Sequence, residues 1–352
     1  MDVLPPYTSH EAIGGTSHTV AHDKGGLEVQ FFSHAVAPTS PPIFHNESII
    51  SGTLHLEVHE SLLSSIHGVT VTLRGFEREM RGAFGQATTM SKTAEIGQTT
   101  FLSVNQELYT HDSGKLAAGT HSWPFALVFP KTFRSVSKKA LDEEFELPPT
   151  FSAPGYPTYL LYELRCEVSK STLAGDEIMS VPILYVPRRE AARPSKARML
   201  AYETGSPAPS PLHDSEGWQT ATATTKVQVF NAREVDISVS FSLARPLEYA
   251  RGTFIPFYMN LTCDDAQALD LLSTPQAFSI VLDRRLHASE PSGRRAVDER
   301  GNGQDTVSEG KYWRAEPNYE GHNTRAFEGE IAVGVQLMQN FTYPKLSLHV
   351  SR

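Results

Sequence analysis

The most specific candidate for chemistry in this sequence is a recognition motif near its start, Leu4-Pro5-Pro6-Tyr7. These residues match the Leu-Pro-x-Tyr variant of the motifs that WW domains bind. Prolines hold the peptide in the extended polyproline II shape before it binds, so little chain entropy is lost, and the tyrosine fixes its register. The motif predicts a WW-domain-binding site, with an accidental match in a proline-containing terminus as the alternative.

A second group has residue types that could bind zinc. His55, Glu57 and His59 alternate along a predicted strand, so their side chains share one face, and imidazole and carboxylate groups are usable zinc ligands. No cysteine or further histidine pair accompanies them at a recognised spacing. The solvated polar face of a strand is therefore the favoured interpretation, and we predict no metal site and no cofactor.

A basic run near the middle of the chain could contact anionic lipid or an acidic partner. Its members are Arg188, Arg189, Arg193, Lys196 and Arg198. The simpler interpretation is a linker that its charge keeps soluble and extended. Ser195, which basic residues flank, is a candidate phosphorylation point, because added negative charge would weaken such an attraction.

Motifs of common catalytic sites do not occur in the sequence. It has no Gly-x-Ser-x-Gly elbow, no His-Glu-x-x-His pair and no glycine-rich phosphate-binding loop. A carbohydrate-active enzyme stays open as an alternative, with a carboxylate pair drawn from Glu57, Glu163 and Glu167. We predict no catalytic residues and a protein that is not an enzyme.

Length and composition indicate a folded protein with about two domains. The chain has 352 residues, of which 39% are hydrophobic and 20% charged. Its formal net charge of −9 argues against nucleic acid as a partner. Only Cys166 and Cys263 could form a disulfide, so none is expected to hold the fold together. With no signal peptide or membrane-spanning stretch, we expect a cytoplasmic protein.

Two-residue alternation of apolar and polar side chains recurs through both halves and is typical of strands with one buried face. It is clearest in residues 50–58, 159–168 and 235–243. In the last of these, Val235, Ile237, Val239, Phe241 and Leu243 are expected to be buried, with the intervening polar residues outward. Because a second sheet is the economical cover for such faces, the sequence predicts an all-β protein with two successive sandwiches.

Other stretches depart from this alternation. Short helices are expected around residues 137–146 and 264–272, and long loops at 78–98 and 287–311. The composition of residues 188–222 is rich in proline, serine and glycine, which indicates an exposed linker that proteases can cut.

Two longer motifs carry a resemblance to a known family. Gly119-Thr120-His121-Ser122-Trp123-Pro124-Phe125 is followed by Leu147-Pro148-Pro149-Thr150-Phe151. Together they resemble the N-terminal domain of arrestin-like proteins. Residues 227–243, 252–263 and 327–331 resemble the C-terminal domain more loosely, and the match is closer to the alpha-arrestins, the fungal-like branch of arrestin-related trafficking adaptors.

The resemblance implies two tandem immunoglobulin-like β-sandwich domains, the arrestin fold. It divides the chain into a flexible N-terminal segment at 1–26, a first sandwich at 27–187, a linker at 188–222 and a second sandwich at 223–352. The family's ligase motifs usually follow the second domain, whereas this sequence ends at Arg352. A second sandwich that lacks a final edge strand is therefore one expectation.

The function implied by the resemblance is that of a non-enzymatic adaptor for endocytosis and protein transport. Such proteins link membrane transporters or receptors, their cargo, to WW-domain ubiquitin ligases, and they associate peripherally with the plasma membrane or endosomes. The alternative is a coat or scaffold subunit of the retromer-like type, which shares the fold and recruits no ligase.

Overall fold

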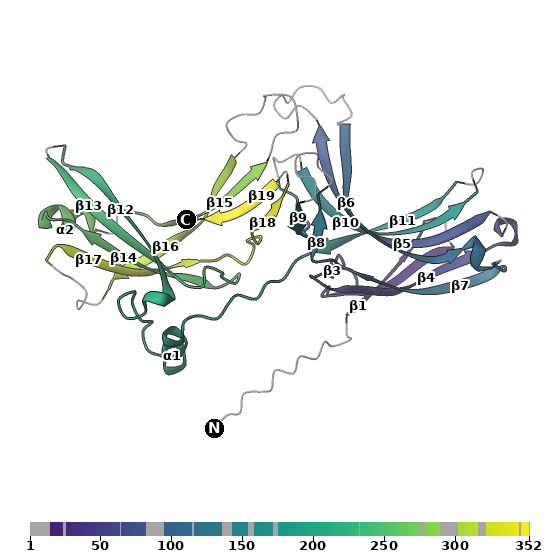
Figure 1. The fold of residues 1–352 in the computed structure, drawn as a ribbon, viewed down its shortest axis with the longest axis horizontal. Helices are drawn as coiled ribbons and strands as arrows, with labels where there is room; N and C mark the ends of the chain where they lie inside the picture. The colour runs from purple at the N-terminus through teal and green to yellow at the C-terminus, as the bar shows by residue number, and fades with distance from the viewer. Residues whose placement is uncertain are drawn as a thin grey trace. The chain divides into compact units, whose positions relative to one another are not determined.

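The structure is a computed structural model of the whole chain. It describes residues 15–23, 26–63, 65–81, 95–114, 116–135, 143–153, 158–171, 175–231, 233–274, 277–288, 302–315, 322–344 and 346–351. Strands predominate among these residues, and their pairing is almost entirely antiparallel (Figure 1). The all-β prediction is confirmed.

The chain divides into two compact units. Unit 1 consists of Met1–Arg188 together with Phe341–Leu346, and unit 2 of Arg189–Asn340 together with Ser347–Arg352. A short piece from the C-terminal end of the chain therefore belongs to the unit that the N-terminal half forms.

Unit 1 contains two main sheets and a small one. Its strands are β1 (Thr16–Ala21), β2 (Leu27–Ser33), β3 (Ile43–Phe44), β4 (Ile49–Val58), β5 (Ile66–Arg81), β6 (Glu95–Thr110), β7 (Gly119–Val128), β8 (Thr132–Arg134), β9 (Glu144–Glu146), β10 (Thr158–Lys170), β11 (Glu177–Tyr185) and β18 (Phe341–Tyr343). One sheet has the order β1-β2-β4-β7 and the other β3-β11-β10-β5-β6, while β8 pairs with β9. Among the described strand pairs of unit 1, only β3–β11 is parallel.

Aromatic side chains join the two main sheets of unit 1 through its core. Phe31 on β2 lies 6.4 Å from Phe44, measured between ring centroids, and Phe44 lies 5.7 Å from Phe129. The ring of Phe129 stacks on Tyr185 of β11 at 4.8 Å and meets Tyr162 of β10 at 6.1 Å. Such ring pairs add to the free energy of apolar burial, and their continuity gives unit 1 a sandwich-like core.

The Leu-Pro-Pro motif is tied to this core by burial and hydrogen bonds. Leu147 is buried, and the Tyr162 hydroxyl donates a hydrogen bond of 2.5 Å to the carbonyl of Pro148. Three residues after Pro148, Phe151 exchanges backbone hydrogen bonds with Leu160 near the start of β10. The motif therefore closes one end of the core, because its carbonyl satisfies a phenol that would otherwise be buried without a partner.

Unit 2 is built from the remaining strands and two short helices among the described residues. Its elements are α1 (Lys196–Thr204), β12 (Trp218–Val229), β13 (Arg233–Ala244), β14 (Phe254–Thr262), α2 (Ala266–Leu272), β15 (Val281–Ala288), β16 (Asn302–Arg314), β17 (Thr324–Ala332) and β19 (Leu346–Ser351). The strands hydrogen-bond in the order β12-β13-β14-β17-β16-β15-β19. Figure 1 shows β12, β13 and α2 at one end of this unit.

One strand serves two layers of unit 2. Residues 302–309 of β16 pair with β15, whereas its last part, from Gly310 to Arg314, pairs with β17. Leu282 of β15 packs in one cluster with Phe257 of β14 and Ile331 of β17, so the two parts face each other across a core. Strands that pass from one sheet to the other form the corners of sandwiches. A single series of hydrogen-bonded strands can therefore form both layers around the core of unit 2.

The alternation predicted for β13 is only partly reproduced. The segment is a strand, with Ile237 and Leu243 buried, but Val235, Val239 and Phe241 are only half-buried, and Ser242 is buried although an outward position was expected. β13 lies next to β12, the edge strand of this sheet. Because Ala221 and Ala223 of β12 are exposed, the opposite layer does not fully cover this edge.

Loops and helices follow the sequence predictions less closely. Strands β5, β6 and β16 extend well into the expected loops, and the parts of those loops at 82–94 and 289–301 lie outside the described residues. Helix α2 confirms the prediction at 264–272. The helix expected at 137–146 is wrong for Glu144–Glu146, which pair with β8 as β9, and 137–142 lie outside the described residues. Among the described residues, neither α1 nor α2 has the length and apolar character to cross a bilayer.

Candidate functional site

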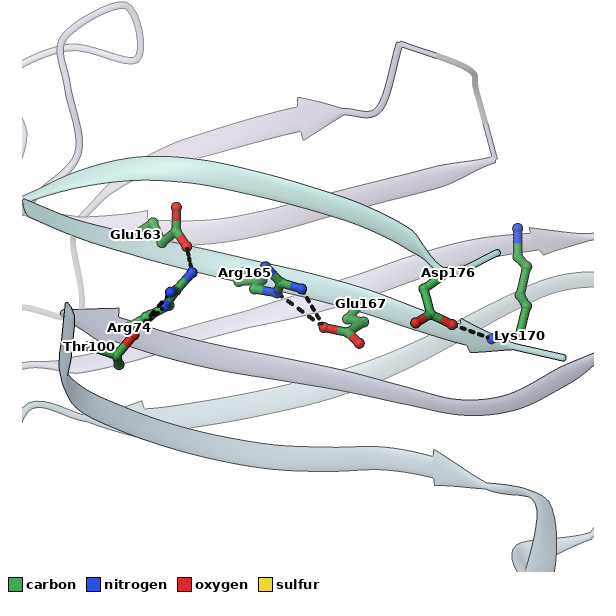
Figure 2. Close-up of polar contacts among 7 residues, drawn as sticks. All are labelled: Arg74, Thr100, Glu163, Arg165, Glu167, Lys170 and Asp176. Atoms are coloured by element: carbon green, nitrogen blue, oxygen red, sulfur yellow. Dashed lines mark hydrogen bonds and ion pairs between the residues drawn. The ribbon is translucent and has the colours of Figure 1, made fainter. Parts of the chain in front are cut away.

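The outward face of the five-stranded sheet in unit 1 carries a row of paired charges (Figure 2). Along β10, buried and partly exposed residues alternate without a break, so Glu163, Arg165 and Glu167 all point away from the core. The cross-strand register places Arg74 of β5 opposite Glu163. We refer to these four residues, with Thr100, Lys170, Asp176 and Glu177, as the charged face.

Arg74 is the most connected member of the charged face. Its guanidinium donates to Glu163 at 3.2 Å and to the Thr100 hydroxyl at 2.9 and 3.1 Å. It also lies 5.2 Å from the ring centroid of Phe76, and the guanidinium of Arg78 lies 5.5 Å from the same centroid. Planar guanidinium groups stack on aromatic rings in this way, and the stacking restricts the Arg74 side chain.

The other charges are paired as well. Arg165 donates to Glu167 at 2.9 Å, and the Lys170 ammonium group lies 2.7 Å from Glu177. The backbone N–H of Lys170 donates to Asp176 at 2.9 Å, as Figure 2 shows. These pairs leave the charged face polar and of mixed sign.

The spacing of the acids bears on the enzyme alternative. Glu163 and Glu167 are four residues apart on one strand, so their Cα atoms lie about 13 Å from each other at the usual rise per residue. Paired carboxylates in glycoside hydrolases stand about 5–10 Å apart. Glu57 lies on β4, which belongs to the other main sheet of unit 1.

The histidines considered as zinc ligands have other surroundings. His55 lies on β4, with its Nδ1 atom 2.7 Å from the Ser122 hydroxyl of β7. Glu57 is exposed on the same strand, and His59 follows the end of the strand. Within the described ranges, no three His, Cys, Asp or Glu side chains are arranged as a metal site.

The basic run divides into exposed and buried members. Arg188, Arg189, Arg193 and Lys196 are exposed, whereas only 2% of the surface of Arg198 is accessible. Arg198 is thus inaccessible to a lipid or acidic partner, because it lies on the inward side of helix α1. The segment predicted as a linker therefore contains a helix that is packed onto unit 2.

Arg198 connects α1 to the start of β12. Its guanidinium donates to the carbonyls of Gly217 at 2.8 Å and Arg245 at 2.9 Å, and it lies 4.7 Å from the ring centroid of Trp218. Ser195 caps the helix by accepting the backbone N–H of Arg198 at 3.2 Å. The proline- and serine-rich composition thus does not mean that this segment is an irregular linker, since it forms a capped helix. Composition alone could not show that the guanidinium of Arg198 is buried.

A buried carboxylate in unit 1 was not anticipated from the sequence. Glu77 is opposite Leu160 in the register of β5 and β10, so its side chain points into the core, where it is 2% exposed. Its carboxylate accepts a hydrogen bond of 2.8 Å from the hydroxyl of Tyr343 on β18. The register of β5 with β10 is unbroken here, so Glu77 lies on the same inward face as Val69, Val71 and Leu73, and what the sequence does not reveal is the buried partner, Tyr343.

Aromatic rings hold the C-terminal piece of unit 1 in place. Tyr343 lies 5.5 Å from Phe101 and 5.7 Å from Phe133, between ring centroids, and Phe341 lies 5.3 Å from Phe151. All of these side chains are buried. Phe341 and Tyr343 therefore complete the core of unit 1 although they follow most of unit 2 in the chain.

Burial of phenols predicts that unit 1 loses stability at alkaline pH. Burial raises the pKa of Tyr185 to about 12, and it raises the pKa values of Tyr162 and Tyr343 above the usual 10.0. The unfolded chain therefore releases these protons first, so stability is complete below pH 10 and decreases above it, for Tyr185 until about pH 12. Each phenol contributes a slope of about 1.4 kcal/mol per pH unit within its window.

Urea denaturation across this pH range measures the effect. The Tyr343→Phe variant, which has one phenol fewer, should show a shallower decrease above pH 10 than the wild type. A free energy of unfolding that stays constant there would contradict the burial of these hydroxyls.

The predicted WW-binding residues, Leu4, Pro5, Pro6 and Tyr7, lie outside the described residues. Their role therefore stays a prediction from the sequence. No model of a known protein family matches the chain, and no curated protein matches its sequence significantly.

Proposed function

We propose that the chain is a non-enzymatic adaptor that links membrane-protein cargo to a WW-domain ubiquitin ligase during endocytosis and trafficking. In this proposal the two units are tandem immunoglobulin-like sandwiches of the arrestin type. The support is the resemblance of the two sequence motifs around Trp123 and Pro148, together with the sandwich-like, all-β character of the structure.

The observation that carries the ligase part is the Leu4-Pro5-Pro6-Tyr7 motif, which precedes the first strand of unit 1. A short proline-containing peptide can enter an aromatic groove without disturbing a folded domain, since its recognition depends on local backbone shape. The motif then acts as the recruiting element, while the folded units bind cargo.

The charged face of unit 1 is the surface that we assign to cargo. Its Arg74, Glu163 and Arg165 side chains are partly exposed and are held by neighbours, so a partner would meet them in defined positions. Pre-ordered polar groups lose less entropy on binding than free side chains do. The exposed Arg188, Arg189, Arg193 and Lys196 supply a second contact, to the anionic surface of the cargo's membrane.

The competing assignment is an arrestin-fold coat or scaffold subunit of the retromer-like type. It would need no WW partner, so binding of a WW domain separates the two. The structural features of the units serve either function equally well.

The test is titration of the full chain with a panel of WW domains from ubiquitin ligases. We expect a dissociation constant in the micromolar range, because a short motif buries little area. Tyr7→Ala should weaken binding by at least about tenfold, equal to about 1.4 kcal/mol, because it removes the side chain that fixes the register. Calorimetry measures both values.

The matched control is Tyr202→Ala, which removes an exposed tyrosine from helix α1. It should bind like the wild type. Absence of binding by the wild type, or equal binding by the Tyr7→Ala variant, would overturn ligase recruitment and favour the coat assignment.

A further inference from the structure

Strand β12 ends the order of strands in unit 2 and is long for an edge strand. It has 12 residues, and among the described strands β13 is its neighbour, in an unbroken register from Trp218↔Ala244 to Val229↔Arg233. Every residue from Thr220 to Lys226 is exposed. Long exposed edges offer their backbone groups to another strand.

The register shows which backbone groups face the free edge. The N–H of Arg245 donates to the carbonyl of Gly217 at 2.8 Å, one step before the paired Trp218 and Ala244. In an antiparallel ladder, residues that bond to the neighbour alternate with residues that face away from it. Odd-numbered residues of β12 therefore bond to β13, and Thr220, Thr222 and Thr224 direct their N–H and C=O groups to the free edge.

This edge has few of the features that prevent strands from pairing. Natural edges are protected by prolines, bulges or charges, especially lysine. From Trp218 to Val229 there is no proline, no register shift is recorded, and the single charged residue is Lys226. Its ammonium group lies 2.7 Å from Glu234 of β13, so its charge is balanced within the unit.

Each face of β12 carries side chains of one kind, and these lie beside side chains of the same kind on β13. On one face Thr220 lies 2.7 Å from Ser242, between hydroxyl oxygens, and Thr222 and Thr224 are opposite Ser240 and Ser238. On the other face lie Ala221 and Ala223, beside the half-buried Phe241 and Val239. One face of the edge therefore carries hydroxyl groups and the other carries small apolar groups.

From this geometry we propose that β12 pairs in antiparallel fashion with β12 of a second copy of the chain, centred on Thr222. Thr222 then exchanges two backbone hydrogen bonds with Thr222 of the second copy, and Thr220 faces Thr224. Hydroxyl groups meet hydroxyl groups, and Ala221 meets Ala223.

A second copy is favoured as the occupant because the free edge of β12 matches itself in the antiparallel register centred on Thr222. In the register centred on Thr222, Lys226 is opposite Trp218 of the second copy, so no like charges meet between the two strands. The hydroxyl-bearing face of β12 continues into the hydroxyl-bearing face of the second copy, and the alanine face continues into the alanine face. The apolar side gains cover for Ala221 and Ala223, which the opposite layer of unit 2 leaves exposed. Because the contact is one strand wide, we expect a dissociation constant in the micromolar range.

The first experiment measures the mass of the full chain in solution by light scattering after gel filtration, over a range of micromolar concentrations. The wild type should approach the mass of a dimer at the highest concentrations. Thr222→Pro removes a free-edge N–H without removing a bond to β13, and prolines are tolerated at edges. This variant should stay monomeric and retain the melting temperature of the wild type.

Thr222→Ala is the matched control, since it keeps the backbone N–H and loses only the hydroxyl. It should dimerise like the wild type. A wild type that stays monomeric at every concentration, or a Thr222→Pro variant that dimerises equally well, would overturn the proposal.

The second experiment tests the register and does not depend on how proline affects folding. Directly opposed residues in a hydrogen-bonded pair have Cα atoms about 5.5 Å apart, which is within the range of disulfides. Thr222→Cys should therefore form a covalent dimer when a mild thiol oxidant such as diamide is added. Both native cysteines, Cys166 and Cys263, are buried and should not react.

Gln228→Cys places an exposed thiol on the same strand, but in the centred register it lies far from its counterpart. It should give little covalent dimer. Equal crosslinking of both variants would contradict the centred register, and no crosslinking of Thr222→Cys would rule out a β12 junction. Neither result depends on WW binding, so this inference can fail without affecting the proposed function.

Discussion

Replacing Tyr162 with alanine should destabilise unit 1 by about 3–5 kcal/mol, the usual cost of emptying a fully buried aromatic site. The Tyr162 ring contacts Phe101, Phe129 and Tyr185, with centroid distances of 5.6, 6.1 and 5.4 Å. Because these rings come from different elements, the cavity would border several of them. Urea denaturation followed by circular dichroism measures the loss, and hydrogen exchange of β10 assigns it to unit 1.

Tyr162→Phe is the matched control. It keeps the ring and removes only the hydroxyl that donates to Pro148, so it should cost about 1–3 kcal/mol for an unsatisfied buried carbonyl. A loss below about 1 kcal/mol for Tyr162→Ala would show that the aromatic core does not stabilise unit 1.

Arg198→Ala should release helix α1 from unit 2. The change leaves the carbonyl of Arg245 without the Arg198 donor, leaves the carbonyl of Gly217 with the Arg245 N–H alone, and removes the cation over Trp218, a combined loss of about 2 kcal/mol or more. Limited proteolysis measures the result. The wild type should resist cleavage within α1, and the variant should be cut there rapidly, because protease sensitivity follows local unfolding.

The control for this experiment is Arg193→Ala, which removes an exposed arginine two residues before the helix cap. It should be cleaved like the wild type. Identical cleavage of the Arg198→Ala variant and the wild type would show that the buried guanidinium does not hold the helix.

Strands with one fully covered face were predictable from the sequence. β10 follows the expected alternation throughout, because the other sheet of unit 1 covers its inner face. β13 follows it only in part, since Phe241 and Val239 lie where the cover ends. Alternation thus predicts which face turns inward, whereas the depth of burial depends on the width of the opposite layer.

Contacts with distant parts of the chain were not predictable. Glu77 continues the inward alternation of Val69, Val71 and Leu73, but the partner that satisfies its buried carboxylate, Tyr343, is 266 residues away in the sequence. Arg198 resembles its exposed neighbours in composition, yet it is buried by contacts with Gly217 and Arg245. Single-sequence patterns report local preference, whereas the buried contacts of these two side chains are tertiary.

The candidate site shows the same division. Outward positions of Glu163 and Glu167 were expected from alternation, but their pairing with Arg74 and Arg165 required the cross-strand register and side-chain geometry. The WW-binding motif was found from the sequence alone, because recognition of a short peptide depends on local residue types and not on a fold.

Strand β16 gives unit 2 a particular kind of cooperativity. Since the same strand supplies the neighbour of β15 through one part and of β17 through the other, neither layer can separate while β16 stays intact. When partial unfolding of one layer disorders β16, the other layer loses its hydrogen bonds to β16 as well. We therefore expect the two layers to unfold together and not as independent units. A force applied along β16 would act on both layers, and the step from Glu309 to Gly310, where the pairing of β16 changes from β15 to β17, is where one layer passes into the other.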